Sequence, residues 1–325
     1  MSDFIEELYK EIGSNDCNQS VTDYLDTGIL PLNKIISGKY TGGIPVGRIT
    51  EISGAASCGK TLVATMALIQ TQIKKGMAVF LDYEHAFDVE RGKTLGLVTS
   101  KNKWIYKQPT TAEDGFEIIE KIIGVIRKSD TKIPITIVID SIASMITKAE
   151  LDAKYDPNMK TRLSLASFLS SALKQIASKA SKFNITLIFL NQIRENPSVM
   201  FGDKEYTAGG NAMKFYASVR IKLVKGKKIE DAEKNIIGET ITAKIEKNKI
   251  APPFQKTIYI SDFSMGVDLE TTHINVLEEM GLFGKIKGYV EFEGKKYRKK
   301  ELVDLCRQDK KLYQKLLSLF KDNLK

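Results

Sequence analysis

One stretch of this sequence, from Gly54 to Thr61, reads Gly-Ala-Ala-Ser-Cys-Gly-Lys-Thr and matches the pattern G-x-x-x-x-G-K-T. Residues 48–53 alternate like a strand, and the apolar run 61–70 continues like a helix. A glycine-rich turn between them directs backbone N–H groups at one point, where the helix dipole adds positive potential. The context predicts a phosphate-binding loop in which Lys60 contacts the β- and γ-phosphates and Thr61 ligates Mg²⁺. The nucleotide-binding residues of this loop would be Gly54, Ala55, Ala56, Ser57, Cys58, Gly59, Lys60 and Thr61.

The composition predicts a soluble globular protein of the cytoplasm. Of the 325 residues, 42% are hydrophobic and 27% are charged. The sequence contains no apolar run of the roughly 18 residues that a membrane helix needs. Cys17, Cys58 and Cys306 are too scattered for a metal site, so we expect reduced thiols. The net charge of +9 favours a polyanionic partner, although a charged surface can also serve solubility alone.

Three apolar runs read as buried strands, at residues 77–82, 133–140 and 185–190. Helical patterns lie between them at 112–128 and 163–183. Alternating strands and helices indicate an α/β fold with a mostly parallel sheet and right-handed crossovers.

The pattern changes after Gln192. Residues 194–211 contain Pro197 and three glycines and show no periodicity, which is typical of a functional loop. Strand-like runs follow, and we expect three units: a helical arm and linker at 1–25, a core at 26–270 and a small domain at 271–325. The arm helix, 3–12, would dock on its own core or on a neighbouring subunit.

The last unit is predicted to be α+β and basic. A helix is expected at 273–280, a hairpin with Gly294 at its turn, and one long helix at 300–324. From Lys285 onward there are 13 Lys and Arg against 6 Asp and Glu, so most of the positive charge lies at this end.

Polar residues follow the three predicted strands at one edge of the sheet, where ligands bind in open α/β proteins. Asp140 fits an acid that holds Mg²⁺ through water, or else a helix N-cap. Glu84 is placed to polarise a water molecule, or else to form a surface ion pair. Gln192 is placed to report a γ-phosphate to the following loop, or else to cap a backbone group.

Cys58 lies inside the phosphate loop, next to a helix N-terminus that would lower the pKa of its thiol. This position suggests inhibition by oxidation. The alternative is that Cys58 is simply a small residue that the loop tolerates.

Several segments together resemble the bacterial RecA recombinases in order and spacing. They are Gly54–Thr61, Leu81–Asp88, Val138–Ser141, Asn191–Arg194, Gly209–Arg220 and Lys247–Phe254. The resemblance covers about residues 25–270. It implies a RecA-type P-loop ATPase core whose ATP-dependent helical homo-filament pairs single-stranded DNA with homologous duplex. The composition and short C-terminus are also compatible with a phage-encoded relative.

The same resemblance implies roles at the nucleotide. Glu84 matches the family's catalytic glutamate and Gln192 its γ-phosphate sensor. Lys247 and Lys249 match the cations that reach the ATP of the adjacent protomer. Without the resemblance, the two lysines would be interpreted only as neighbours on one face of a strand. Three further positions match contacts to the base: Asp88 at the adenine amino group, Arg91 in place of a stacking tyrosine, and Phe263 near the nucleotide.

The resemblance also implies two loops that contact DNA, one near 155–162 and one at 193–207. Arg162 stands where the family inserts a methionine, and Pro197 stands where it inserts an aliphatic residue. Contacts to the single strand would be made by Arg162, Ser170, Lys174, Arg194, Gly209, Gly210 and Asn211. A basic strip for the second strand, or a merely solvated face, would consist of Lys225, Lys227, Lys228 and Lys244. The basic C-terminal domain would capture duplex through phosphates, without the acidic tail of many relatives.

Three other functions stay open at this point. A small-molecule P-loop kinase would share the phosphate loop but not the long loop after Gln192. A filament-forming DNA scaffold would bind ATP and hardly hydrolyse it. A RecA-like ATPase that unwinds DNA or loads proteins would not need Lys247 and Lys249.

Overall fold

The structure is a computed structural model that describes residues 6–7, 10–11, 21–129, 133–153, 161–195, 205–286 and 288–322. Of the predicted arm helix, 3–12, only residues 6–7 and 10–11 are among these, and they are helical. Most of both predicted DNA loops, including Pro197, lies outside the described residues.

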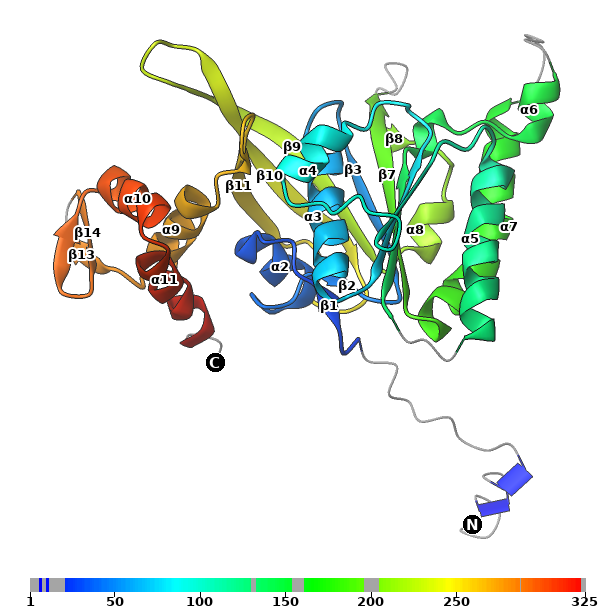
Figure 1. Ribbon diagram of the computed structural model, residues 1–325, viewed down its shortest axis with the longest axis horizontal. Coiled ribbons are helices and arrows are strands. Elements are labelled where there is room, and N and C mark those ends of the chain that lie inside the picture. Colours follow the sequence, from blue (N-terminus) through cyan, green and yellow to red (C-terminus); the bar gives the residue numbers. More distant parts are fainter. Residues whose placement is uncertain are drawn as a thin grey trace.

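A large mixed sheet organises the chain (Figure 1), in the order β12-β11-β10-β9-β3-β7-β6-β4-β5. Its strands are β3 (Ile49–Gly54), β4 (Met77–Asp82), β5 (Trp104–Lys107), β6 (Ile135–Asp140), β7 (Ile185–Glu195), β9 (Val219–Glu230), β10 (Ile236–Asn248), β11 (Lys256–Asp262) and β12 (Gly266–Val267). The six strands from β5 to β9 are parallel, whereas β10, β11 and β12 are antiparallel to their neighbours. A short strand, β8 (Glu205–Thr207), pairs with the end of β7. The predicted α/β class with a mostly parallel sheet is confirmed.

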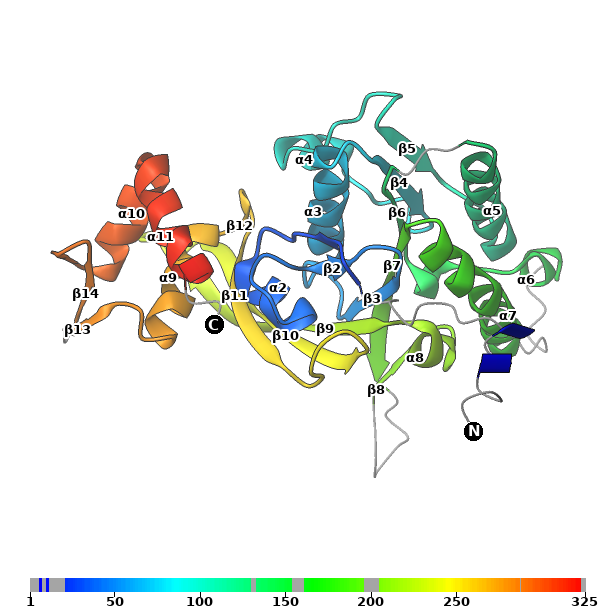
Figure 2. The same cartoon turned by 90° about the horizontal axis from the view of Figure 1, so that it is seen from below.

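Helices cover both faces of the sheet, and each covered face has its own apolar core (Figure 2). On one face lie α2 (Leu30–Ser37), α3 (Lys60–Ile73) and α4 (Val89–Thr94), beside a two-stranded sheet of β1 (Tyr24–Leu25) and β2 (Ile44–Pro45). On the other face lie α5 (Ala112–Lys128), α6 (Lys148–Asp152), α7 (Thr161–Lys182) and α8 (Ala212–Tyr216). The start of α5 follows from sequence, because Thr111 and Asp114 form a capping box.

The C-terminal unit packs beside β11 and β12. It contains α9 (Leu269–Glu279), β13 (Gly284–Ile286), β14 (Tyr289–Phe292), β15 (Lys295–Tyr297), α10 (Lys299–Gln308) and α11 (Lys310–Asp322). The expectation of one helix at 300–324 is wrong. Asp309 adopts an extended backbone, and its carboxylate accepts the N–H groups of Lys311 and Leu312, so a second helix begins there. Tyr40 of the core is buried in the apolar cluster of this unit, which anchors it.

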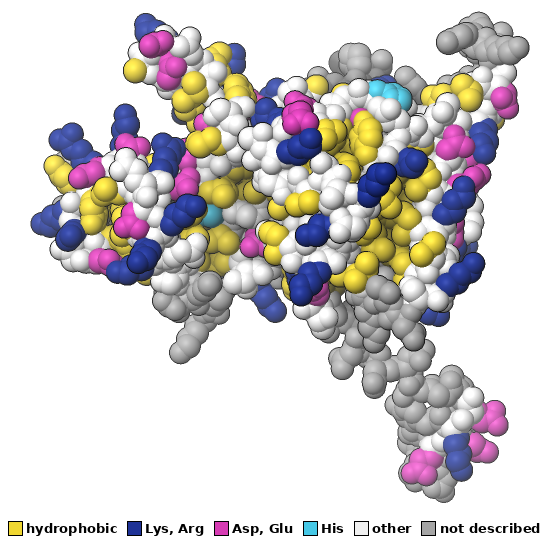
Figure 3. Space-filling view, viewed as in Figure 1, with side chains coloured by type: hydrophobic (Ala, Val, Ile, Leu, Met, Phe, Trp, Pro, Cys, Tyr) yellow, Lys and Arg dark blue, Asp and Glu magenta, His cyan; other side chains and the backbone are white. Residues whose placement is uncertain are grey.

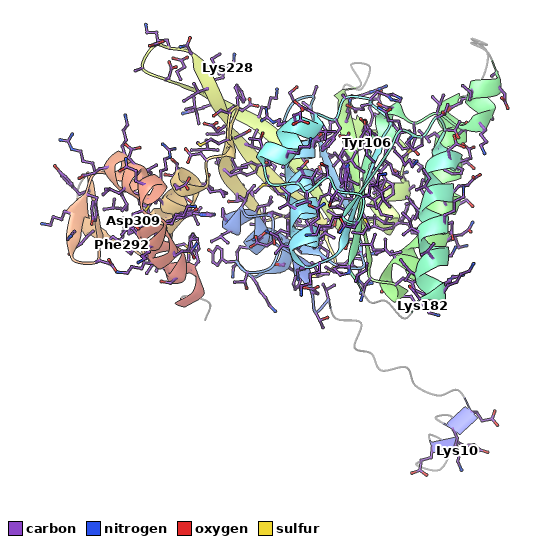
Figure 4. The ribbon with its side chains drawn as sticks, viewed as in Figure 1. Lys10, Tyr106, Lys182, Lys228, Phe292 and Asp309 are labelled. Atoms are coloured by element: carbon purple, nitrogen blue, oxygen red, sulfur yellow. The ribbon has the colours of Figure 1, made fainter. Side chains whose placement is uncertain are left out.

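Two features of the surface bear on function. Strands β9 and β10 form a hairpin that projects from the body, with Lys228 on it (Figures 1 and 4). Lys and Arg side chains are spread over the C-terminal unit (Figure 3). Among the described residues, no helix is long and apolar enough to cross a bilayer.

Candidate nucleotide and DNA sites

The phosphate loop joins the end of β3 to the start of α3. Gly59 precedes the helix with φ +82°, a left-handed conformation that glycine adopts without strain. A Cβ on Gly54 would lie 2.5 Å from Cys58 Sγ, so this position also requires glycine. Phosphate oxygens can therefore come close to this turn and to the N–H groups at the start of α3.

Lys60 and Thr61 open the helix and bond to different partners. The Lys60 ammonium donates to the carbonyl oxygens of Gly54 (3.2 Å) and Ala55 (2.7 Å). The Thr61 hydroxyl donates to Asp140 Oδ2 at 2.9 Å. Burial, with the Glu84 carboxylate adding to it, raises the pKa of Asp140 to about 6. Asp140 is thus joined to the loop and is not the N-cap of the turn that follows, which begins after Ser141.

Glu84 follows β4 and Asp140 ends β6, whereas Gln192 lies within β7, which is longer than predicted and ends at Glu195. The sheet brings the three residues to one edge. The Glu84 carboxylate accepts hydrogen bonds from Ser141 Oγ at 2.5 Å and from Gln192 Nε2 at 2.8 Å. These two donors orient Glu84 and link the strand before the long loop to the site of the phosphate loop. A carboxylate held in this way can accept a proton from water, as hydrolysis requires.

Asp82 is a residue of this edge that sequence reasoning missed. It is buried and accepts hydrogen bonds from the Tyr106 hydroxyl (2.8 Å) and from the N–H groups of Glu84 and Phe87 (both 3.1 Å). It therefore fixes the turn that carries Glu84. The signal in the sequence was an acid at the end of an apolar strand.

A divalent cation fits the oxygen atoms of Thr61 and Asp140. No group of three His, Cys, Asp or Glu residues suited to a metal occurs in the described ranges. A hydroxyl and a carboxylate, completed by phosphate oxygens and water molecules, are the kind of ligands that Mg²⁺ prefers.

The predicted acidity of Cys58 is wrong. Its side chain is fully buried beneath the loop, and this burial raises the pKa of the thiol despite the nearby Lys60 charge. A buried thiol is less reactive, which removes the basis for inhibition by oxidation.

The three residues predicted to contact the nucleotide base lie in two separate parts of the fold. Asp88 caps α4 by accepting the N–H of Arg91 at 2.9 Å, and both side chains are exposed. Phe263 follows β11 and is 47% exposed. An exposed guanidinium and an exposed ring are both available for stacking.

Lys247 and Lys249 both lie near the end of β10 but differ in their hydrogen bonds and exposure. The Lys247 ammonium donates to the carbonyl oxygens of Lys214 (2.5 Å) and Phe215 (2.9 Å), at the C-terminal end of α8. Burial, with the charges of Lys249 and Arg220, lowers the pKa of Lys247. Lys249 is exposed. One of the two cations is therefore held within its own subunit.

A cavity of about 690 Å³ lies at the base of the predicted second DNA loop. It brings together Arg194, Gly209, Gly210 and Asn211, as the resemblance implied. Sequence reasoning missed three cations in its lining: Lys214, Arg220 and Lys222. Ser170 and Lys174 are exposed on α7, outside this lining, and the Ser170 hydroxyl donates to Ala166 O. The side chain of Arg162, at the start of α7, lies outside the described residues.

Lysines also gather on the antiparallel strands. Lys244 of β10 is directly opposite Lys222 of β9 and Lys256 of β11, so the three share one face. Like charges in register repel one another and favour a bound polyanion. Lys225, Lys227 and Lys228 are exposed farther along β9, with Lys225 4.0 Å from Glu239.

A buried polar network lies between the two sites. Glu51 of β3 accepts hydrogen bonds from Asn191 Nδ2 at 2.9 Å and from Arg220 Nε at 2.5 Å. Arg220 also pairs with Glu246 at 3.2 Å, and Asn191 Nδ2 bonds the carbonyl oxygen of Ala208 at 3.0 Å. Asn191, the residue next to Gln192, is thereby tied to Ala208 at the end of the predicted second DNA loop.

A parallel sheet with this loop and this carboxylate edge defines a P-loop nucleotide-binding protein. The family model described as "RecA N-terminal domain" matches residues 4–268. A protein named Protein RecA from Bacteroides thetaiotaomicron is 36% identical over 312 residues, which is 94% of this chain and 90% of that protein. Proteins of the same name are 35% identical in Desulforapulum autotrophicum (84% of this chain, 74% of that protein) and Francisella tularensis subsp. novicida (93% and 82%). The chain belongs to the RecA family. These relatives support a recombinase function, and nothing in them favours a small-molecule kinase.

Proposed function

We propose that this protein is an ATP-dependent recombinase that forms helical filaments on single-stranded DNA and catalyses homologous pairing and strand exchange in the cytoplasm. The hydrogen bonds from Gln192 and Ser141 to Glu84, beside the Thr61–Asp140 pair, carry this proposal. They join a nucleotide-hydrolysing edge to the strand that leads into the DNA loop.

Residues of this chain would divide the work of ATP hydrolysis as follows. Lys60 and the loop N–H groups bind the phosphates, while Thr61 and Asp140 hold Mg²⁺, which neutralises phosphate charge when bound. Glu84 accepts a proton from the attacking water. Lys247 and Lys249 would stabilise the developing charge on the nucleotide of the adjacent subunit. The hydrogen bonds that hold Lys247 on α8 support slow turnover by an isolated subunit.

The charged surfaces support two kinds of DNA contact. The cavity with Arg194, Asn211 and Lys214 fits the backbone of a single strand. The row of Lys222, Lys244 and Lys256 fits a second strand. The basic C-terminal unit would bind duplex without reading its sequence.

ATP hydrolysis is measured without DNA, with single-stranded DNA and with duplex, for the wild type and for Glu84→Gln. We expect strong stimulation by single strands and a loss of about 10²- to 10⁴-fold in the variant, because Gln cannot accept the proton. Nucleotide binding by Glu84→Gln should stay within a few-fold of the wild type, since the phosphate loop is unchanged. A strand-exchange assay with the wild type then tests whether ATP hydrolysis is coupled to strand exchange.

Wild-type hydrolysis that does not respond to DNA at any concentration would rule out a DNA-dependent motor. Binding of single-stranded DNA without turnover would instead support the scaffold function.

A further inference from the structure

Tyr259 is a buried tyrosine beneath the phosphate loop. It lies on β11, opposite Ile241 of β10, and is 1% exposed. Its hydroxyl has no hydrogen-bond partner among the described residues. Burial raises the pKa of this hydroxyl further above neutral pH, so it keeps its proton and is available as a donor.

The hydroxyl oxygen points at the loop. It lies 3.8 Å from the place that a Cβ on Gly59 would occupy. The neighbouring Cys58 is fully buried and interacts electrostatically with Tyr259. Cys58 Sγ in turn fills the space beside Gly54. Tyr259 and Cys58 together form the floor under both ends of the loop.

Packing alone does not explain the hydroxyl. A phenylalanine would fill the same space in the core without burying an unpaired polar atom, which is unfavourable. The hydroxyl is therefore expected to gain a partner when the loop changes conformation.

Lys60 indicates when such a change occurs. Its ammonium gives two of its three N–H donors to the carbonyl oxygens of Gly54 and Ala55, and a bound phosphate would compete with these oxygens for its charge. The hydrogen bonds from Lys60 to the loop carbonyl oxygens would then weaken, and a further donor beside the loop would compensate.

We propose that Tyr259 is a positioning residue whose hydroxyl donates a hydrogen bond to the phosphate loop when Lys60 binds a nucleotide phosphate. The hydroxyl then stabilises the nucleotide-bound loop and contributes to affinity rather than to the stability of the free protein. This inference rests on the proposed function, since it assumes that the loop binds ATP.

The test is Tyr259→Phe in the full-length protein. Equilibrium binding of a fluorescent ATP analogue with Mg²⁺ is measured at a temperature where circular dichroism shows both proteins folded. Thermal unfolding is measured without nucleotide. We expect about tenfold weaker binding, which corresponds to about 1.4 kcal/mol, and an unfolding midpoint that is unchanged or higher.

Tyr313→Phe is the matched control. The Tyr313 hydroxyl already has a partner, His273 Nδ1 at 2.7 Å, far from the loop in sequence. Its removal should lower the unfolding midpoint and leave nucleotide affinity unchanged.

Equal affinity of Tyr259→Phe and the wild type would overturn the proposal. Weaker binding together with a lower unfolding midpoint would also overturn it, because the hydroxyl would then be paired without nucleotide. A wild type that does not bind the analogue at all would contradict the proposed function itself.

Discussion

His273 is a single residue that joins the C-terminal unit to the core. It is 2% exposed, and its Nε2 accepts the N–H of Leu30 at 3.3 Å. Its Nδ1 bonds the Tyr313 hydroxyl, and its ring packs against Phe320. Burial lowers the pKa of His273 to about 4, so the ring is neutral at physiological pH. Protonation would place an unpaired charge at this junction.

Acid should therefore destabilise the protein through His273. The unfolded histidine, with a pKa near 6.5, binds its proton before the folded one does. The stability that the neutral His273 ring contributes is complete above pH about 6.5 and is lost as pH falls toward about 4. It amounts to about 3 kcal/mol of unfolding free energy. Urea unfolding between pH 4.5 and 7.5 should show a steeper loss in the wild type than in His273→Gln.

The second histidine of the chain, His85, provides the control for this effect. It is exposed, so His85→Gln should follow the wild-type pH dependence. Parallel curves for the wild type and His273→Gln would show that the buried ring does not control acid stability.

Strands β3, β7 and β9 are held together by polar side chains as well as by backbone hydrogen bonds. Glu51 of β3 has no exposed surface and depends on Asn191 of β7 and Arg220 of β9. A buried carboxylate is stable only when such donors surround it. Asn191 also holds the carbonyl oxygen of Ala208, which follows the predicted second DNA loop. The network stabilises the sheet and the start of α8 together.

Asn191→Ala should lower the free energy of unfolding by about 1–3 kcal/mol, because it leaves a buried Glu51 carboxylate oxygen without its hydrogen-bond donor. It should also weaken binding of single-stranded DNA, since Ala208 loses its anchor. Urea unfolding and DNA titration measure the two effects. The exposed Asn102→Ala serves as control and should stay within about 0.5 kcal/mol of the wild type. An unchanged unfolding free energy in Asn191→Ala would contradict this role.

At the scale of the whole molecule, the proposed site is incomplete in one subunit. Glu84 acts electrostatically on Asp140 of its own subunit, which bonds Thr61 of the phosphate loop. Lys249 is exposed just after β10 and would act on a neighbour. Glu84→Gln and Lys249→Met should each be inactive alone. Mixed in equal amounts with single-stranded DNA, they should recover about a quarter of wild-type hydrolysis, from interfaces that combine an intact Glu84 with an intact Lys249.

The control mixes Glu84→Gln with Lys310→Met, a change at an exposed lysine of the C-terminal unit. This mixture should retain only the activity of its Lys310→Met component. If Lys249→Met and Glu84→Gln together hydrolyse no more ATP than either alone, Lys249 does not act between subunits.

Local patterns were sufficient for most of the fold. Strand and helix periodicities placed β3, β4, β6 and α5 within one or two residues and α3 within three, because each buries a continuous apolar face. The break at Asp309 was missed, since the apolar spacing of α10 and α11 reads as one helix and only the backbone at Asp309 separates them.

The phosphate loop and the three polar strand ends were determined by the sequence itself, because backbone direction alone brings the carboxyl ends of parallel strands to one edge. Only the tertiary structure decided which partners these residues have. Distant segments supply the donors to Glu84 and Glu51, the α8 carbonyl oxygens that hold Lys247, and the core that buries Cys58 and Tyr259. Burial and hydrogen bonding across long sequence separations depend on packing, which no local pattern encodes.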